Sequence, residues 1–455
     1  MDDPIPRPRR AALGALAAAA LAVLLAAPAT AAPRTPTAAA APALRDAHIV
    51  AAYHYLLARL LVLRQQQLDL QDGMAWNQLS HRDADATLGL AASDAWIAVD
   101  ASSCTLLDLP PIDGRYHTVQ VLNGWGDTLV NLNDRTAPYR RAGRVAFCAR
   151  GAHPPLPPGT PRIELPGGQA RLRIRIALGG DAPAATELQR RIILAPTGTP
   201  AIALPPPIPA FSDTALPGAE AFEQTEALLA GAPDIEAGMD APRAAARQVA
   251  AALADPTARA RIDAVIRAEA IPQLHTARLT FGTQRDGWSR PATVGTYGGD
   301  YLSRSLVAFT DLWANVASEV VAFTAAVDGD GQPLDGSTVY RLTFPAGQHP
   351  DRLARYFWSL AAIDAQGAEL IDTAQPRLPH SRSGPEPDAD GALTLVLAAA
   401  LPAGVPESNW LPTPAGRAYR LALRFYGPSP VLQAGQYFPP PLRPTSPLPQ
   451  EEGEG

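Results

Sequence analysis

Proline is the feature that most restricts how this chain can fold. The sequence has 48 prolines among its 455 residues, which is about twice the usual share of ~5%. Proline lacks a backbone N–H and has a fixed φ, so it interrupts helices and central strands. The regular elements should therefore be short and separated by many turns, an organisation that suits β-sandwiches and jelly rolls.

The first 31 residues are typical of a secretory signal peptide. Three arginines precede an unbroken apolar run over residues 11–27, and Ala29-Thr30-Ala31 resembles an A-x-A cleavage site. The seventeen residues of this run are near the lower limit for a bilayer span, for which ~20 are usual. We therefore expect a periplasmic or secreted protein of the cell envelope, exported by the Sec or Tat route. An uncleaved membrane anchor is the alternative.

The charged residues exclude several classes of partner and reaction. The formal net charge is −6, and loss of residues 1–31, with three arginines and two aspartates, would make it −7. No basic block is present, so nucleic acid is not an expected partner, and a membrane is one only if the N-terminal segment stays uncleaved. All 38 basic residues are arginines. A chain without lysine cannot form a Schiff base or use a P-loop lysine or a Ser-Lys dyad.

The chain contains two cysteines, Cys104 and Cys148. Both lie in segments with strand-like patterning, and an oxidising compartment favours their pairing. We predict a disulfide between them, with two separate buried thiols as the alternative.

Hydrophobic patterning predicts two β-rich halves with a small helical segment between them. Apolar residues at three- and four-residue steps predict a helix over residues 46–71, and alternation predicts strands between residues 94 and 194. Helices are predicted over residues 241–254 and 256–268, with Asp255 capping the second. The expected divisions are a signal peptide (1–31), a disordered leader (32–43), an N-terminal domain (44–200), a helical linker domain (201–274), a C-terminal domain (275–442) and a disordered tail (443–455).

Two strands carry arginines at alternate positions. Residues 171–176 alternate between arginine and an aliphatic residue, and residues 418–426 place Arg420 and Arg424 on one face. In the first strand the aliphatic residues should face a core. Its three arginines could form a positive strip for an anionic ligand, but we favour a solvated face where they meet carboxylates on a neighbouring strand.

The sequence contains no motif that identifies a reaction. No G-x-S-x-G elbow, H-E-x-x-H helix, Gly-rich phosphate loop or C-x-x-C pair is present. The string "DGDGQPLDG" over residues 328–336 resembles the start of a calcium loop, but its glycine comes too early and no glutamate closes it. We interpret this string as a tight turn, and "DADG" over residues 388–391 likewise. No metal site and no cofactor are predicted.

Several strings together resemble a known bacterial family pair. They are "FWS" (357–359), "NWLPTPAG" (409–416), "LRFYGP" (423–428) and "YGGDYLSRS" (297–305) in the second half, and "GRYHTVQVLNGW" (114–125) and "DRT" (134–136) in the first. The chain resembles proteins that pair domain of unknown function 1254 with domain of unknown function 1214. The resemblance implies an N-terminal β-sandwich, a helical middle segment and a C-terminal jelly-roll-like domain. It implies no established activity.

We therefore expect a mainly β, cofactor-free binding or structural protein of unknown activity, whose partner is a small molecule or a component of the cell envelope. A secreted hydrolase or lyase with a site between the two β domains is the alternative. For each single residue, a structural ion pair or turn bond is the competing interpretation. We expect Trp410 to fill the end of the C-terminal sandwich and Asn409 to bond backbone groups, or a ligand near Arg424. The candidate ligand-binding residues are Asp94, Arg135, Arg175, Arg304, Asn315, Asn409, Trp410 and Arg424.

Overall fold

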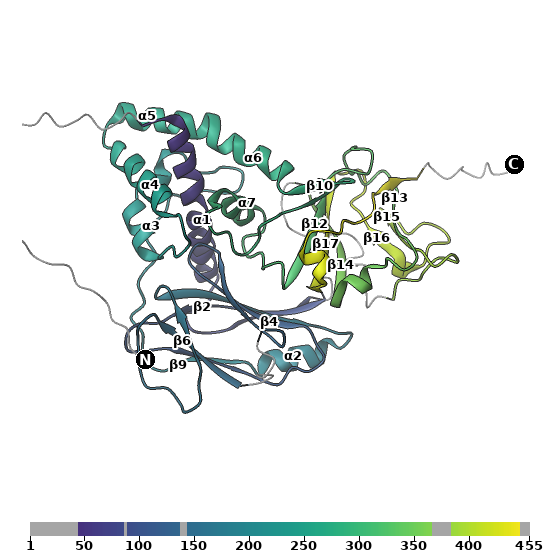
Figure 1. Ribbon diagram of the computed structural model, residues 1–455, viewed down its shortest axis with the longest axis horizontal. Coiled ribbons are helices and arrows are strands. Elements are labelled where there is room, and N and C mark those ends of the chain that lie inside the picture. The colour runs from purple at the N-terminus through teal and green to yellow at the C-terminus, as the bar shows by residue number, and fades with distance from the viewer. Residues whose placement is uncertain (1–43, 86–88, 137–142, 366–383, 446–455) are drawn as a thin grey trace, which may run out of the picture. The chain divides into compact units, whose positions relative to one another are not determined.

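The computed structural model describes residues 44–85, 89–136, 143–365 and 384–445. The predicted signal peptide and leader, and most of the predicted tail, lie outside these residues. Within them the protein is mostly β, with strands in four sheets and a helical middle segment (Figure 1). The predicted fold class is therefore confirmed.

The first β-rich part is a sandwich of two sheets. Their inner faces share one core, to which the aliphatic residues of the arginine-bearing strand contribute Leu172, Ile174 and Ile176, as predicted. Helix α2 (Ala182–Arg190) follows this strand and is capped by Asp181. One sheet has the order β1 (Ser80–Asp85), β2 (Leu90–Ala98), β8 (Gln169–Ala177), β4 (His117–Leu122), β5 (Thr128–Leu132), and the other β7 (Arg162–Leu165), β6 (Gly143–Ala149), β3 (Thr105–Leu109), β9 (Ile193–Pro196).

The predicted disulfide is confirmed. Cys104 precedes β3, Cys148 lies on the paired strand β6, and the two sulfur atoms are bonded. Both side chains are fully buried. The bond therefore links two neighbouring strands on the face of their sheet that is remote from the sandwich core.

Replacing both cysteines by serine should lower the free energy of unfolding by about 2–4 kcal/mol, the usual contribution of a native disulfide. Denaturant unfolding of the double variant against the oxidised protein measures this loss. Mass spectrometry of the unreduced protein should show no free thiol. Two alkylatable cysteines in the folded protein would contradict the assignment.

The helices form one core of their own. Its buried residues come mainly from α1, and the other helices and Trp125 of the β4–β5 turn add a few each. The two helices predicted in the middle segment are confirmed as α4 and as α5 with its continuation η2, and the Asp255 carboxylate accepts a hydrogen bond from the Thr257 N–H as a cap. The elements are α1 (Asp46–Gln71), η1 (Ala219–Phe222), α3 (Thr225–Gly231), α4 (Asp240–Ala252), α5 (Pro256–Val265), η2 (Ile266–Ala270), α6 (Ile271–Thr280) and α7 (Tyr301–Thr310).

Helix α1 joins this core although it precedes the first sandwich in sequence (Figure 1). It is long and apolar enough to cross a membrane by length and composition, yet 78% of its most apolar stretch is buried inside the protein. A helix that is apolar on most sides needs cover on most sides. Helices α4 and α7, from distant parts of the sequence, supply that cover.

The last part of the chain is a second sandwich. Along β17, Tyr419, Leu421, Leu423 and Phe425 face the core between its sheets. Short helical turns η3 (Pro350–Leu353), η4 (Glu407–Asn409) and α8 (Pro430–Gln433) connect the strands. One sheet has the order β10 (Thr283–Arg285), β11 (Trp288–Arg290), β12 (Val320–Ala325), β17 (Tyr419–Pro428), β14 (Ala354–Asp364), and the other β16 (Trp410–Pro412), β15 (Leu393–Ala398), β13 (Tyr340–Phe344), β18 (Arg443–Pro444).

The string over residues 328–336 forms the predicted turn. The Asp328 carboxylate accepts hydrogen bonds from the N–H groups of Asp330 and Gln332, each at 2.9 Å. This side chain stabilises the turn backbone, as aspartates commonly do in turns.

Candidate ligand pocket

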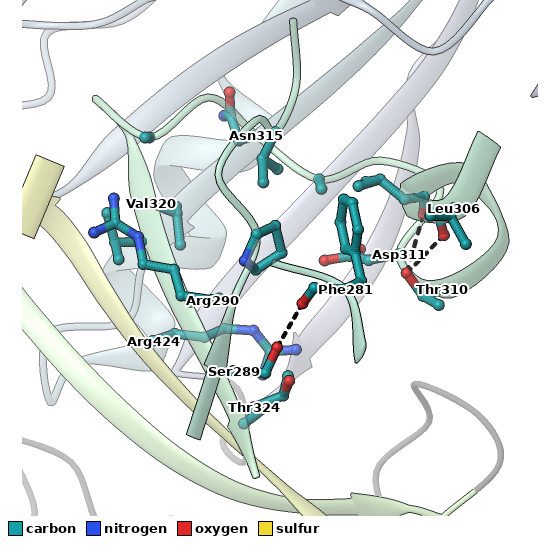
Figure 2. A pocket seen from close by; sticks show the side chains of 18 of the residues that line it. Phe281, Ser289, Arg290, Leu306, Thr310, Asp311, Asn315, Val320, Thr324 and Arg424 are labelled. Carbon is teal, nitrogen blue, oxygen red and sulfur yellow. Dashed lines mark hydrogen bonds between the residues drawn. The ribbon is translucent and has the colours of Figure 1, made fainter. Parts of the chain in front are cut away.

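A cavity of about 150 Å³ lies between the helical core and the outer face of the sheet that contains β12 and β17. Strand alternation creates its floor. Because Leu421 and Leu423 point into the sandwich core, Ala422 and Arg424 point the opposite way, into the cavity. Figure 2 shows Leu306, Thr310 and Asp311 on the side of α7, and Val320 and Arg424 on the side of the sheet.

Four arginines surround this otherwise mostly apolar cavity: Arg278, Arg290, Arg420 and Arg424. The apolar wall includes Phe281, Leu306, Val307, Val320 and Ala322. The single carboxylate among the described lining residues belongs to Asp311, which is exposed. The cavity therefore has an excess of positive charge.

Three of these arginines, Arg290, Arg420 and Arg424, form no ion pair with any carboxylate of the described residues. Arg290 is 8% exposed, donates one hydrogen bond to the Gln433 carbonyl at 3.1 Å, and has a buried Nη1 without a partner. The buried Nε of Arg420 also has no partner. Burial lowers the pKa of Arg290, and burial together with repulsion from Arg278 lowers the pKa of Arg420. The site has hydrogen-bond donors and positive charge available for an anion.

Two hydroxyl groups in the cavity, those of Ser289 and Thr310, are bonded to the backbone. Ser289 donates to the Phe281 carbonyl at 2.6 Å, and Thr310 donates to the Leu306 carbonyl at 2.9 Å (Figure 2). No histidine accompanies them among the described lining residues. Nucleophilic catalysis by a hydroxyl requires an adjacent base, whereas these two hydroxyls donate their protons to backbone carbonyls.

Two of the eight predicted residues, Asn315 and Arg424, line this cavity. Asn315 also exchanges hydrogen bonds with Asn131 of the first sandwich, at 2.9 and 3.0 Å. Arg278, Arg290 and Arg420 were not predicted as ligand residues. Alternation along β17 already placed Arg420 beside Arg424, but no sequence signal brings α6 to that face or places β11 in the same sheet.

Asp94 and Arg175 belong to a different, tightly packed cluster on the outer face of β2 and β8. Asp94 is 1% exposed and lies 3.2 Å from Arg173, 3.5 Å from Arg175 and 3.7 Å from Arg171. Although burial opposes its ionised form, these arginines hold the pKa of Asp94 well below its usual range. The prediction that the arginines meet a carboxylate on a neighbouring strand is confirmed.

The predicted solvation of this face is wrong. Arg171 is 2% exposed, pairs with Asp69 of α1, and lies against the rings of Trp96 and Trp313. Arg173 donates to the Trp313 carbonyl at 3.4 Å. Helix α1 and the segment after α7 cover this face of the sheet, and sequence alternation alone does not reveal such cover.

Arg135 and Arg304 also have carboxylate partners. Arg135 pairs with buried Glu319 and lies over the rings of Tyr116 and Tyr356. These contacts connect the two β-rich halves.

Arg304 is buried between two aspartates in the helical core. It lies 3.1 Å from Asp234 and 3.6 Å from Asp127, with the Trp125 ring beneath it at 4.6 Å. Burial raises the pKa of Asp127 to about 6, against the opposing effects of Arg304 and Asn123.

Stability should therefore depend on pH through Asp127. Its folded-state pKa lies above the unfolded value of 3.8, so the folded protein binds the proton more tightly. The corresponding stabilisation is complete below about pH 4 and is lost as the pH rises through about 6. Urea unfolding between pH 4 and 7.5 should show a flatter profile for Asp127→Asn than for the wild type, and no flattening for the exposed control Asp240→Asn. Parallel profiles would contradict this assignment.

Asn409 and Trp410 lie away from the cavity, at β16. The Asn409 amide bonds the backbone of Glu386 in both directions, at 2.7 Å, and the Thr394 carbonyl at 3.0 Å. The expected hydrogen bonds of Asn409 to backbone groups are therefore confirmed. Arg424, near which a ligand was the alternative partner, lines the cavity. Trp410 is 4% exposed and its indole donates to the Ala398 carbonyl at 2.9 Å.

Among the described residues, no group of three His, Cys, Asp or Glu side chains is arranged as metal ligands would be. The arginines of the cavity are the residues best suited to hold a bound group, and they suit an anion.

Two protein-family models match the chain. The model described as "Protein of unknown function (DUF1254)" matches residues 88–196, and the model described as "Protein of unknown function (DUF1214)" matches residues 319–430. The predicted family resemblance is confirmed in both halves.

A solved protein structure has a similar fold. The crystal structure of the VPA0106 protein from Vibrio parahaemolyticus is similar with a TM-score of 0.64 and 17% identity, over 88% of this chain and 100% of that chain. A putative uncharacterized protein from Burkholderia cenocepacia is similar with a TM-score of 0.41 and 12% identity, over 86% of this chain and 87% of that chain. No curated protein matches the chain.

Proposed function

We propose that this protein binds a small apolar organic acid in the cavity described above. Its DUF1254 and DUF1214 regions are both described only as of unknown function, so the proposal is based on the residues of the cavity. The proposal is based on three arginines that have no carboxylate partner and lie around a mostly apolar cavity. The carboxylate of a ligand would supply the missing negative charge.

The size of the cavity indicates the size of the ligand. An apolar cavity of about 150 Å³ accommodates a benzene-sized molecule, and this cavity has that volume. The ligand body would therefore be an aromatic ring or a short aliphatic chain of about six carbon atoms. Arginine binds carboxylates through two parallel hydrogen bonds, so an acid such as benzoate or hexanoate combines both requirements.

The place of action we propose is the periplasm or the cell envelope. The Cys104–Cys148 disulfide supports an oxidising compartment, and the apolar N-terminal segment supports export. In this proposal the protein is a cofactor-free binding protein. The backbone-bonded hydroxyls of Ser289 and Thr310 support this function over the alternative of a hydrolase or lyase.

Isothermal titration calorimetry with matched acids and neutral analogues tests the proposal. Benzoate and hexanoate should bind at least about tenfold more tightly than benzamide and hexanamide, a difference of about 1.4 kcal/mol. Arg420→Gln and Arg424→Gln should each remove this preference, with folding checked by thermal melts. Arg417→Gln is the matched control, because Arg417 is exposed just before the same strand. Equal binding of benzoate and benzamide, or no binding of either acid, would refute the proposal.

A further inference from the structure

Arg59, which does not line the cavity described above, is also buried without a carboxylate partner among the described residues. Arg59 of α1 is 3% exposed, and its Nη1 donates to the Gly124 carbonyl at 2.8 Å. Its Nε is buried and has no partner, and it forms no ion pair with a carboxylate of the described residues.

The other fully buried arginines of the protein do not share this arrangement. Arg171 pairs with Asp69 and Asp94, and Arg304 pairs with Asp127 and Asp234. Removing a guanidinium from water without a paired negative charge is costly. Burial lowers the pKa of Arg59 to about 10, so it still carries its charge at neutral pH.

Arg59 lines a small cavity at the junction of the helical core and the first sandwich. Gln66 and Trp96 contribute to the cavity together with the backbone turns at Gly124 and Gly167. The buried Gln66 Oε1 also has no partner. The oxygen and nitrogen of a glutamine amide can exchange places by rotation, so Gln66 can present its N–H groups to the cavity.

The dimensions of this cavity restrict what it can hold. Its volume is about 10 Å³, which is close to the minimum for one water molecule. Sulfate, phosphate and carboxylates are therefore too large. The surrounding backbone leaves little room for expansion, since a Cβ on Gly124 would lie 2.9 Å from Arg59 Nη1 and one on Gly167 would lie 3.0 Å from Pro233.

We propose that Arg59 and the Gln66 amide bind a single monoatomic anion, chloride, between α1, the β4–β5 turn and the β7–β8 turn. The anion supplies the negative charge that carboxylates supply to Arg171 and Arg304. It thereby stabilises the contact of the helical core with the first sandwich. This proposal is independent of the organic-acid cavity, because the two sites share no residue.

Thermal melts of the full-length mature protein in sodium chloride and in sodium gluconate, at equal ionic strength, test the proposal. Gluconate is too large for the site, so the wild-type Tm should rise by about 2 °C for each tenfold increase in chloride above saturation, and not in gluconate. Arg59→Met should lose this difference. Arg424→Gln should retain it, which separates this site from the organic-acid cavity.

Bromide provides a second measurement that does not depend on a variant. Crystals of the wild-type protein soaked in sodium bromide should show an anomalous peak beside Arg59 Nε. A water molecule alone at that position, or equal Tm values in chloride and gluconate, would overturn the proposal.

Discussion

Replacing Asp94 by asparagine should lower the free energy of unfolding by about 3–5 kcal/mol, the cost of removing one partner from a buried ion pair. The substitution keeps the shape of the side chain but removes its charge. Arg173 and Arg175 would then remain at the cluster without their nearest carboxylate. Urea unfolding at pH 7 measures the loss.

The control for this variant is Asp240→Asn, at a carboxylate whose side chain is 99% exposed. Its effect should stay within about 0.5 kcal/mol. Adding Arg173→Met to Asp94→Asn should recover part of the stability, because one uncompensated charge is removed. A loss below 1 kcal/mol for Asp94→Asn, or no recovery in the double variant, would show that the cluster is solvated as the sequence alone had indicated.

Replacing Trp410 by alanine should also cost about 3–5 kcal/mol, as deletions of large buried aromatic residues do. The indole is nearly inaccessible and its N–H bonds the Ala398 carbonyl of the neighbouring strand β15. Trp410→Phe keeps most of the apolar surface and loses only the indole hydrogen bond, because the Ala398 carbonyl still accepts from the Thr413 N–H at 3.1 Å. A smaller loss of about 0.5–1.5 kcal/mol is therefore expected. Thermal and denaturant melts measure both losses.

Leu401→Ala is the control for Trp410→Ala, because Leu401 follows strand β15, whose Ala398 carbonyl accepts the indole bond, and is 43% exposed. It should change stability by no more than about 0.5 kcal/mol. Unchanged melting of Trp410→Ala would reject the structural role and return Trp410 to the group of accessible ligand contacts.

The local features of the fold could be predicted because short-range physics controls them. Alternation along β8 and β17 depends on the pleat of a strand, and it correctly separated core-facing from outward-facing residues. The Asp255 cap and the Asp328 turn depend on hydrogen bonds over a few residues. The disulfide was predicted because the sequence has two cysteines in strand-like segments and an N-terminal segment from which we expect export.

The candidate site could be predicted only in part. Asn315 was among the predicted candidates and lines the cavity, and strand alternation placed Arg424 on an outward face. Six of the eight predicted residues have partners elsewhere, in the Asp94 cluster, the interface of the two halves, the helical core and strand β16. Their residue types suit a ligand and an ion pair equally well, and the sequence does not show which partner is near.

The sequence by itself determined the mostly β character, the short elements, the position of the helical segment and the absence of lysine chemistry. Tertiary structure alone decided which arginines are neutralised. Arg171, Arg173 and Arg175 share the buried carboxylate of Asp94, whereas Arg290 and Arg424 face an apolar cavity. This difference depends on contacts across long sequence separations, such as those that bring α6 and α7 to one face of the sheet that contains β11 and β17. Hydrophobic periodicity contains no information about these contacts.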